Sequence, residues 1–382
     1  MIYVKTKSAP ERFPGNFKMS DNYFYVPRAY SRPIEEKIDD QLLYRDTEHP
    51  ELNSHQFSFE VTAGYRKPSS YLPFYCIIEK TNGHFILGTN NFTTCVNDAI
   101  VMATEQFDSI INRKIEDSQF QIPETSSITG LKALEGNLFL VATKDYQIQL
   151  WDSSIKEGNS KILKCGQTFT EGFVSNMDKL TKDEKFVIGT SKGSIYIYDY
   201  DLKDLMSLTH YPMAHSSEIK GISADPSGKK RWTSCSIDKS CALWDTSKER
   251  PALTLLRDHQ NRLTAVYWTS QEENKGLVMV GDEIGNILTV DPRAPRKILN
   301  QTRISNREIT KICFNSGTKH FGAVSKSNKL KVITIEDCEE LKVTRTHEST
   351  KMIYDMCWDQ SDKENFYVVG EQHYAECISL KM

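Results

Sequence analysis

The chain has 382 residues, 38% of them hydrophobic and 10% aromatic, which is enough for a sizeable core in one large domain or in two to three smaller ones. Its 48 basic and 51 acidic residues give a formal net charge of -3, so the molecule as a whole has no attraction to nucleic acid or to an anionic membrane. Neither direct nucleic-acid binding nor membrane binding is therefore expected.

Two further features concern the cellular compartment. The N-terminus lacks the apolar run of a secretory signal, and no stretch approaches the ~18 apolar residues of a membrane span. The nine cysteines are odd in number and contain no C-x-x-C pair, which fits reduced thiols better than a disulfide framework. We expect an intracellular protein.

Residues 1–55 are predicted to form an extended, partly disordered N-terminal arm, because prolines interrupt a polar sequence there. These prolines are Pro10, Pro14, Pro27, Pro33 and Pro50. The next segment, "QFSFEVT" at residues 56–62, places Phe57, Phe59 and Val61 on one face, as a half-buried strand does. From there to residue 382 the chain is predicted to form one all-β domain.

Apolar runs of five to seven residues, rich in Val, Ile, Tyr and Phe, recur along this domain between glycines and short polar turns, which is typical of strands. One run, "IQLWD", ends in Trp151-Asp152, and similar runs return at spacings of 43 to 48 residues. The residues equivalent to Trp151 are Ala103, Tyr198, Trp244, Val290, Ile333 and Ser379. Seven such units, two of which end this strand in a Trp-Asp dipeptide, resemble a seven-bladed WD-repeat β-propeller.

Two more strands precede the Trp-Asp strand in each unit. The innermost are predicted at residues 75–79, 128–133, 175–180, 219–224, 263–268, 309–314 and 353–358. The next are predicted at residues 84–88, 138–143, 186–190, 231–236, 277–281, 320–325 and 366–370. A blade needs a fourth strand, and the last unit has only three. We therefore predict that residues 56–62 complete the seventh blade and close the ring, since an open blade would leave an unpaired edge.

The stretch "SCSIDKSCALWDTS", residues 234–247, gathers a serine, an aspartate and two cysteines, with a histidine a little upstream. A Ser-His-Asp triad would need a serine exposed in a cleft beside an oxyanion hole, whereas Ser234 falls inside the second strand of its unit. In WD-repeat proteins a His, a Ser or Thr, an Asp and a Trp at these positions form a buried hydrogen-bonded chain. The resemblance assigns this structural tether to His215, Ser234, Asp238 and Trp244.

No catalytic residue, metal or cofactor is expected elsewhere. A zinc site at Cys235 and Cys241 would need a second close pair of ligands, and the sequence has no phosphate-binding glycine loop or nucleophile motif. In propeller hydrolases, residues from several innermost strands converge on the central channel. The strand starts here carry a set of mixed charge: Ser127, Ser175, Glu218, Arg262, Glu308 and Met352. A noncatalytic scaffold is the favoured class, and a propeller hydrolase is the alternative from another class.

A closer resemblance rests on four segments: "NGHFILGTNN" (82–91), "SADPSGKKRWTSCSIDKSCALWDTSKERPA" (223–252), "VMVGDEIGNILTVD" (278–291) and "THESTKMIYDMCW" (346–358). In order and spacing they are similar to the WD-repeat subunit of the methylosome, the Valois type. This resemblance implies a hetero-oligomer with a type II protein arginine methyltransferase, in which the chain helps present Sm proteins or histones for symmetric dimethylation. It also implies a role in small nuclear ribonucleoprotein assembly and a location in the cytoplasm and nucleus.

In that family, the docking feature is the loop between the second and third strands of the first blade. Gly88 to Ala103 spans 15 positions here, whereas Gly189 to Tyr198 in the third blade spans 9, so the first-blade loop is about six residues longer. A protruding loop with apolar residues suits an interface anchor, and Phe92 is the candidate for it. The predicted partner-binding residues are Asn90, Asn91, Phe92, Thr93, Thr94, Cys95, Val96, Asn97 and Asp98.

Other scaffolds remain alternatives at this point. A nuclear-pore propeller, a ubiquitin-ligase receptor or a ribonucleoprotein-assembly propeller would have the same blades. Fold alone does not separate these functions.

Overall fold

The computed structural model describes short strands near the N-terminus and most of the chain beyond residue 52. The described residues are 3–5, 23–25, 53–57, 74–81, 84–90, 99–105, 115–121, 128–134, 138–144, 146–152, 162–165, 172–180, 185–199, 206–248, 250–270, 275–315, 318–336, 340–358, 365–370 and 375–379. The chain divides into two compact units, Met1–Glu48 and His49–Met382. Among the described residues, no helix has the length and hydropathy that crossing a membrane requires.

In the first unit, β1 (Tyr3–Lys5) pairs with β2 (Tyr23–Tyr25) as an antiparallel two-stranded sheet. The other residues of this unit lie outside the described part of the chain, so the disorder expected for the arm stays a prediction. The arm was expected to reach residue 55, but residues 53–55 belong to strand β3 (Asn53–Phe57), which lies in the second unit.

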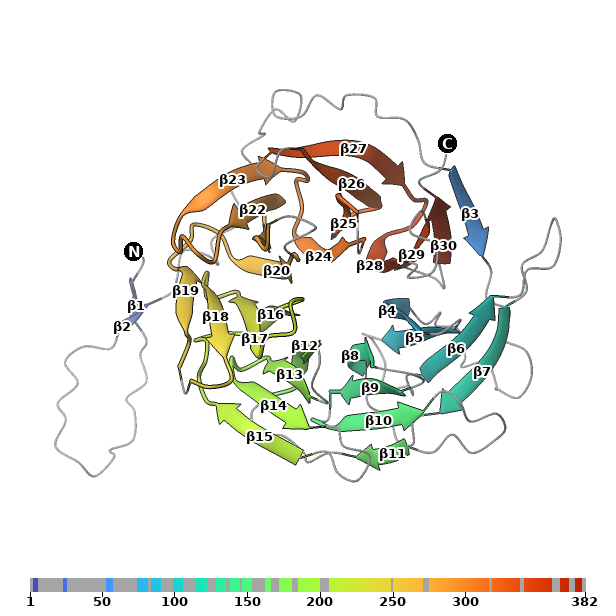
Figure 1. Ribbon diagram of the computed structural model, residues 1–382, viewed down its shortest axis with the longest axis horizontal. Coiled ribbons are helices and arrows are strands. Elements are labelled where there is room, and N and C mark those ends of the chain that lie inside the picture. Colours follow the sequence, from blue (N-terminus) through green and yellow to red (C-terminus); the bar gives the residue numbers. More distant parts are fainter. Residues whose placement is uncertain are drawn as a thin grey trace. The chain divides into compact units, whose positions relative to one another are not determined.

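In the second unit the described strands form seven four-stranded antiparallel sheets (Figure 1). The first strands are β4 (Phe74–Thr81), β8 (Ile128–Ala133), β12 (Val174–Leu180), β16 (Ile219–Ala224), β20 (Leu263–Trp268), β24 (Ile309–Phe314) and β28 (Ile353–Trp358). The second strands are β5 (His84–Asn90), β9 (Leu138–Thr143), β13 (Lys185–Thr190), β17 (Arg231–Ser236), β21 (Val278–Asp282), β25 (His320–Ser325) and β29 (Asn365–Gly370).

The remaining strands complete the sheets. The third strands are β6 (Ala99–Glu105), β10 (Ile148–Asp152), β14 (Ile195–Asp199), β18 (Cys241–Asp245), β22 (Asn286–Val290), β26 (Lys329–Glu336) and β30 (Ala375–Ser379). The fourth strands of the first six sheets are β7 (Ile115–Gln121), β11 (Ile162–Cys165), β15 (Met206–Tyr211), β19 (Leu253–Leu256), β23 (Ile298–Arg303) and β27 (Glu340–Glu348). Each of these six sheets is therefore a meander of four consecutive strands.

The first strands of the sheets lie around a common axis, with the later strands of each sheet progressively farther out (Figure 1). Strand β4 contacts β8, β8 contacts β12, and the series continues through β16, β20 and β24 to β28, which contacts β4. This closed series of sheets makes the second unit an all-β propeller.

The seventh sheet is completed from the other end of the chain. Strand β3 pairs antiparallel with β30, from Asn53 opposite Ser379 to Phe57 opposite Ala375, and gives the order β28-β29-β30-β3. The fourth strand of this sheet is thus Asn53–Phe57, which overlaps the expected segment 56–62 only at residues 56 and 57; residues 58–62 lie outside the described part. The alternation of apolar and polar residues in "QFSFEVT" predicts a strand. Which residues form the fourth strand is decided by their pairing with β30.

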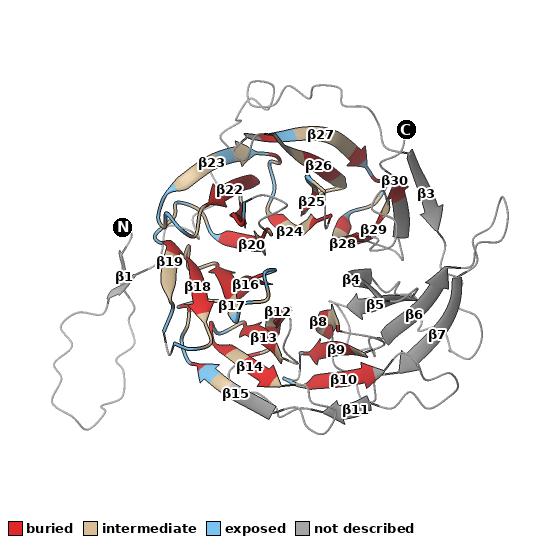
Figure 2. Cartoon of the chain, in the orientation of Figure 1, coloured by how far each residue is buried: buried red, intermediate tan, exposed pale blue. Residues whose placement is uncertain are grey.

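Burial follows the position of a strand in its sheet (Figure 2). Strands β21 and β22 are buried at every residue, because neighbouring sheets cover both of their faces. Strand β23, at the outer edge of the same sheet, has only intermediate and exposed residues. This explains why the sequence shows three apolar runs per unit and hides the fourth strand.

Side chains join adjacent first strands, which share no backbone ladder. The Asp178 carboxylate on β12 accepts the Ala224 N–H of β16 over 2.8 Å, and its other oxygen lies 3.1 Å from Lys132 Nζ on β8. Asn176 accepts the Ile222 N–H over 3.0 Å. These contacts satisfy polar groups that face the centre of the ring and tie three sheets together.

Candidate functional site

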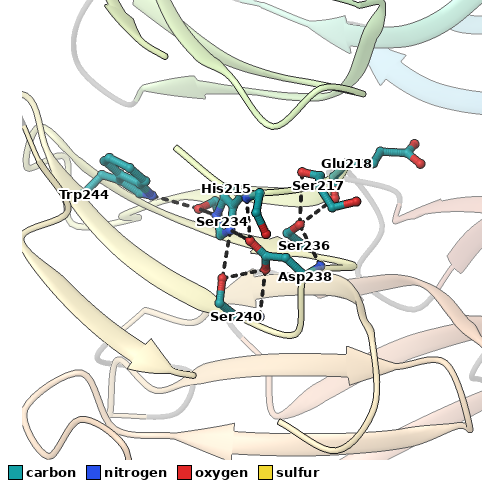
Figure 3. Close-up of polar contacts among 9 residues, drawn as sticks. His215, Ser217, Glu218, Ser234, Ser236, Asp238, Ser240 and Trp244 are labelled. Carbon is teal, nitrogen blue, oxygen red and sulfur yellow. Dashed lines mark hydrogen bonds and ion pairs between the residues drawn. The ribbon is translucent and has the colours of Figure 1, made fainter. Parts of the chain in front are cut away.

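His215, Ser234, Asp238 and Trp244 meet within the fourth sheet (Figure 3). His215 lies on the connection between β15 and β16, Ser234 in β17, Asp238 in the turn after β17, and Trp244 in β18. His215 is 3% exposed, Ser234 0% and Trp244 1%. The fold brings these residues, 29 positions apart at the extremes (244 minus 215), into one buried cluster.

Hydrogen bonds connect the four side chains in sequence. Trp244 Nε1 donates to Ser234 Oγ over 2.8 Å, and that oxygen lies 2.7 Å from His215 Nε2. His215 Nδ1 lies 3.0 Å from Asp238 Oδ2. An indole N–H can only donate, so the Ser234 hydroxyl accepts the hydrogen bond from Trp244. A carboxylate can only accept, so the Nδ1–H of His215 donates to Asp238.

The chain has the order of a Ser-His-Asp triad, but Ser234 is not placed as a nucleophile. Its side chain is fully buried and its oxygen already accepts the indole hydrogen bond. None of the four residues lines the central cavity, which has a volume of about 660 Å³. A substrate would have to open the sheet to reach Ser234. The arrangement instead satisfies buried polar groups, each of which would cost about 1–3 kcal/mol without a partner.

Asp238 receives hydrogen bonds on both carboxylate oxygens. Ser240 donates its N–H over 2.9 Å and its hydroxyl over 2.6 Å to Oδ1, while the Ser216 N–H donates to Oδ2 over 3.0 Å. Burial by itself raises the pKa of the carboxyl, but the hydrogen bond and charge of His215, followed by the bonds from Ser240 and Ser216, outweigh burial and hold the pKa of Asp238 well below its usual range.

The stability that Asp238 contributes is expected to depend on pH. A carboxyl with a depressed pKa in the folded state stabilises the fold above its unfolded pKa of about 3.9, and this stabilisation disappears as the pH falls toward the folded pKa. We expect Asp238→Asn to unfold at lower urea than the wild type at pH 7, with the difference shrinking between about pH 5 and pH 3. A difference that stays constant across this range would contradict the assignment.

Cys235 and Cys241 lie opposite each other on β17 and β18 as free, fully buried thiols. Burial, ahead of the charge of Asp238, raises the pKa of both thiols. They therefore stay protonated and pack as small apolar side chains. In the described part of the chain, no group of three or more His, Cys, Asp or Glu side chains could hold a metal ion.

Two residues of this cluster were not singled out from the sequence. Ser236 Oγ donates to the Glu218 carbonyl over 2.8 Å and accepts the Asp238 N–H over 3.1 Å, and Ser240 donates to Asp238 as described. The signal was present in "SIDKS", because serines two residues before and after a turn aspartate commonly bond the turn backbone.

Other sheets satisfy the same turn with other residues. In the fifth sheet, the fully buried Asp282 accepts Nδ2–H bonds from Asn261 over 2.9 Å and Asn286 over 2.7 Å. In the second sheet, Trp151 Nε1 donates to Gln149 Oε1 over 3.1 Å. In these two sheets other residues therefore pair buried polar groups where the full His-Ser-Asp-Trp set is replaced.

The residues at the starts of the first strands do not form a shared catalytic group. Their charges are met by neighbours in three ion pairs: Glu218–Lys220, Arg262–Glu283 and Glu308–Lys326. Ser175 donates to the carbonyls of Gly189 and Ile219, and Met352 is partly exposed. Ser127 lies outside the described residues.

The connection between the second and third strands is longest in the first sheet. Strand β5 ends at Asn90 and β6 begins at Ala99, so residues 91–98 separate them. In the other sheets three or four residues do so: 144–147, 191–194, 237–240, 283–285, 326–328 and 371–374. Asn90 is the last residue of β5, and the predicted partner-binding residues from 91 to 98 lie outside the described part.

The fold and the buried tether define the class of protein: an all-β propeller of the WD40 type. The family model "WD domain, G-beta repeat" matches residues 206–245. This match runs from the first residue of β15 to the last residue of β18 and contains all four tether residues.

Two relatives carry the comparison further. Protein valois of Drosophila melanogaster is 20% identical over 277 residues, which cover 69% of this chain and 74% of that protein. Methylosome protein WDR77 of Xenopus laevis is 23% identical over 250 residues, which cover 65% of this chain and 72% of that protein. The resemblance to WD-repeat proteins of the methylosome, inferred above from four segments, is confirmed by both.

A solved structure supports the fold independently. A chain in the "Crystal Structure of Mitotic Checkpoint Complex" superposes with a TM-score of 0.66, covering 85% of this chain and 100% of that chain. Its sequence identity is 13%, so this likeness concerns the fold alone.

Proposed function

We propose that this chain is a noncatalytic scaffold subunit, on a seven-bladed propeller, that docks on a type II protein arginine methyltransferase. The methyltransferase supplies the chemistry, and the propeller helps to present arginine-bearing substrates such as Sm proteins or histones for symmetric dimethylation. The complex is a hetero-oligomer of the cytoplasm and nucleus. Support for the partner comes from the likeness to a methylosome protein over 65% of the chain.

The observation that carries the docking proposal is the eight-residue connection between β5 and β6. Its counterparts in the other sheets have three or four residues, which is enough to turn the chain between adjacent strands. The additional residues are not needed for the turn and include Phe92, Cys95 and Val96. Apolar side chains on an extended connection provide the kind of anchor that a partner's pocket buries.

The test is affinity purification of the tagged full-length chain from its own cells. We expect an arginine methyltransferase to co-purify with the wild type, identified by mass spectrometry and by symmetric dimethylation of added Sm protein or histone. The triple variant F92S/C95S/V96S should lose at least ~90% of the enzyme, since about 1.4 kcal/mol corresponds to a tenfold loss of affinity. The matched variant T93A/T94A changes the same connection without removing apolar residues and should retain the enzyme.

Failure of the wild type to bring down a methyltransferase would overturn the proposal. If both variants lose the methyltransferase equally, the conformation of the connection causes the loss. The apolar side chains are then not the anchor. Turnover by the purified chain alone, abolished by Ser234→Ala without unfolding, would favour the hydrolase alternative. Stable capture of a nuclear-pore or ubiquitin-ligase assembly in place of the methyltransferase would favour another scaffold role.

A further inference from the structure

A second candidate binding site lies at the outer edge of the propeller, where the fourth and fifth sheets meet. Strands β19 and β23 are the outermost strands of these sheets (Figure 1). Between them is a pocket of about 410 Å³. It is lined by Leu256, Arg257, Asp258, His259, Gln260, Arg296, Ile298 and Gln301. None of the four tether residues lines the pocket.

Two arginines and one carboxylate, Asp258, line the pocket, so its charge is positive on balance. The Arg257 side chain is 73% exposed, and its nearest carboxylate, Asp258, lies 3.7 Å away with a side chain that is 91% exposed. Among the described residues, no carboxylate lies within ion-pair distance of Arg296, which is also exposed. The molecule has a formal net charge of -3, so this positive pocket is a local feature.

Two connections carry the arginines of the pocket: residues 291–297 carry Arg296, and residues 257–262 carry Arg257. Each of them contains a residue in an uncommon backbone conformation. Arg296 has a φ of 67° and Asp258 a φ of 52°, values that glycine adopts at less cost than an arginine. The Arg296 N–H donates to the Leu255 carbonyl over 2.9 Å. This bond holds residues 291–297 of the fifth sheet against β19 of the fourth sheet. A strained residue held in place by its surroundings is a reason to look for a function of its side chain.

Hydrogen bonds also fix the connection that carries Arg257. The His259 N–H donates to the Lys239 carbonyl over 3.2 Å, and Lys239 Nζ donates to the Gln260 carbonyl over 2.8 Å. The connection that carries Arg257 is therefore anchored to residues 237–240, the turn between β17 and β18. Leu256 and Ile298 add apolar surface between the charged residues.

We propose that this pocket binds a phosphorylated serine or threonine within an extended segment of a partner protein. A phosphate with a charge near -2 matches two guanidinium groups, whose planar donors suit its oxygens. The volume fits one phosphorylated side chain, and the apolar residues can pack against its neighbours. A nucleic acid is a poorer match, because it presents a row of phosphates and the pocket offers only one place for such a group. The inference does not depend on the methyltransferase.

The experiment uses the full-length chain and an array of nine-residue peptides with random flanks around a central phosphoserine or phosphothreonine. Strong binders are then measured by fluorescence polarisation beside the same peptides carrying Ser, Thr or Glu at the centre. We expect saturable binding with at least a ~10-fold preference for phosphate, competed by inorganic phosphate. Arg257→Glu and Arg296→Glu should each weaken it at least ~10-fold.

Two further variants separate the site from general charge and from folding. Arg293→Glu changes an arginine on the same connection that lies outside the pocket lining, and it should leave affinity within about twofold. Arg296→Gly relieves the uncommon backbone conformation, so it should lose binding while melting at the same or a higher temperature than the wild type.

The proposal is overturned if no phosphopeptide binds saturably, or if the Ser, Thr or Glu peptides bind equally well. It is also overturned if Arg293→Glu weakens binding as much as Arg296→Glu, which would mean nonspecific attraction. Tighter binding of a single-stranded oligonucleotide, lost in the same arginine variants, would replace the peptide with nucleic acid as the ligand.

Discussion

Ser234→Ala is expected to lower the free energy of unfolding by about 2–5 kcal/mol. The substitution removes the only hydroxyl between Trp244 Nε1 and His215 Nε2, which it contacts at 2.8 Å and 2.7 Å. Both partners are buried, and each buried polar group left without a partner costs about 1–3 kcal/mol. The loss is measured as a shift in the midpoint of urea unfolding, followed by tryptophan fluorescence because Trp244 lies in the cluster.

The matched control is Ser247→Ala. Ser247 is another serine near the end of the same sheet, and its hydroxyl donates to Asp245 over 2.6 Å at an exposed position. Water can replace that bond, so we expect a change within about 0.5 kcal/mol. If Ser234→Ala is as mild as this control, the buried chain does not stabilise the sheet in the way described.

Removal of residues 1–57 is expected to destabilise the whole propeller, whereas removal of residues 1–48 should leave its melting temperature nearly unchanged. The longer truncation deletes β3, whose five residues pair with Ala375–Ser379 of β30. Each backbone hydrogen bond contributes about 0.5–1.5 kcal/mol net, so the loss of this ladder should cost at least about 3 kcal/mol. It also exposes an unpaired strand edge, which favours aggregation.

The shorter truncation serves as the control because it removes the first compact unit and keeps β3. Differential scanning calorimetry of the two truncations beside the full chain makes the comparison. Equal melting temperatures for all three proteins would mean that β3 does not hold the seventh sheet closed. Equal destabilisation by both truncations would assign the effect to residues 1–48.

Strand positions could be predicted well where both faces of a strand are covered. The first strands at 128–133, 219–224, 263–268, 309–314 and 353–358 have the bounds expected from the sequence. Their side chains must be apolar at regular intervals, and the turns between them need glycine or small polar residues. Outer strands such as β23, "ILNQTR", pack on one side only, so their sequences lack this pattern.

The tether and the arginine pocket also differ in how far the sequence predicts them. The four tether residues lie within one repeat, and the resemblance to WD-repeat proteins assigned them by their positions relative to its strands. Ser236 and Ser240 belong to the same cluster and were not predicted, because serines are so common in turns that their spacing around Asp238 is a weak signal. The pocket with Arg257 and Arg296 was not predicted, because its two arginines belong to different sheets and lie 39 positions apart in the sequence (296 minus 257).

The sequence by itself determined the repeat and the all-β class, because these depend on the order of apolar and polar residues within about 45 positions. Only the tertiary structure decided which segment completes the last sheet and what lies between the outer strands. The pairing of β3 with β30 joins segments more than 300 residues apart, and the arginine pocket is lined by residues from the outer parts of two neighbouring sheets. The strand pairing and the pocket both arise when separate segments of the chain come together in the closed ring. A local pattern of apolar and polar residues therefore predicts neither the register of the pairing nor the residues of the pocket.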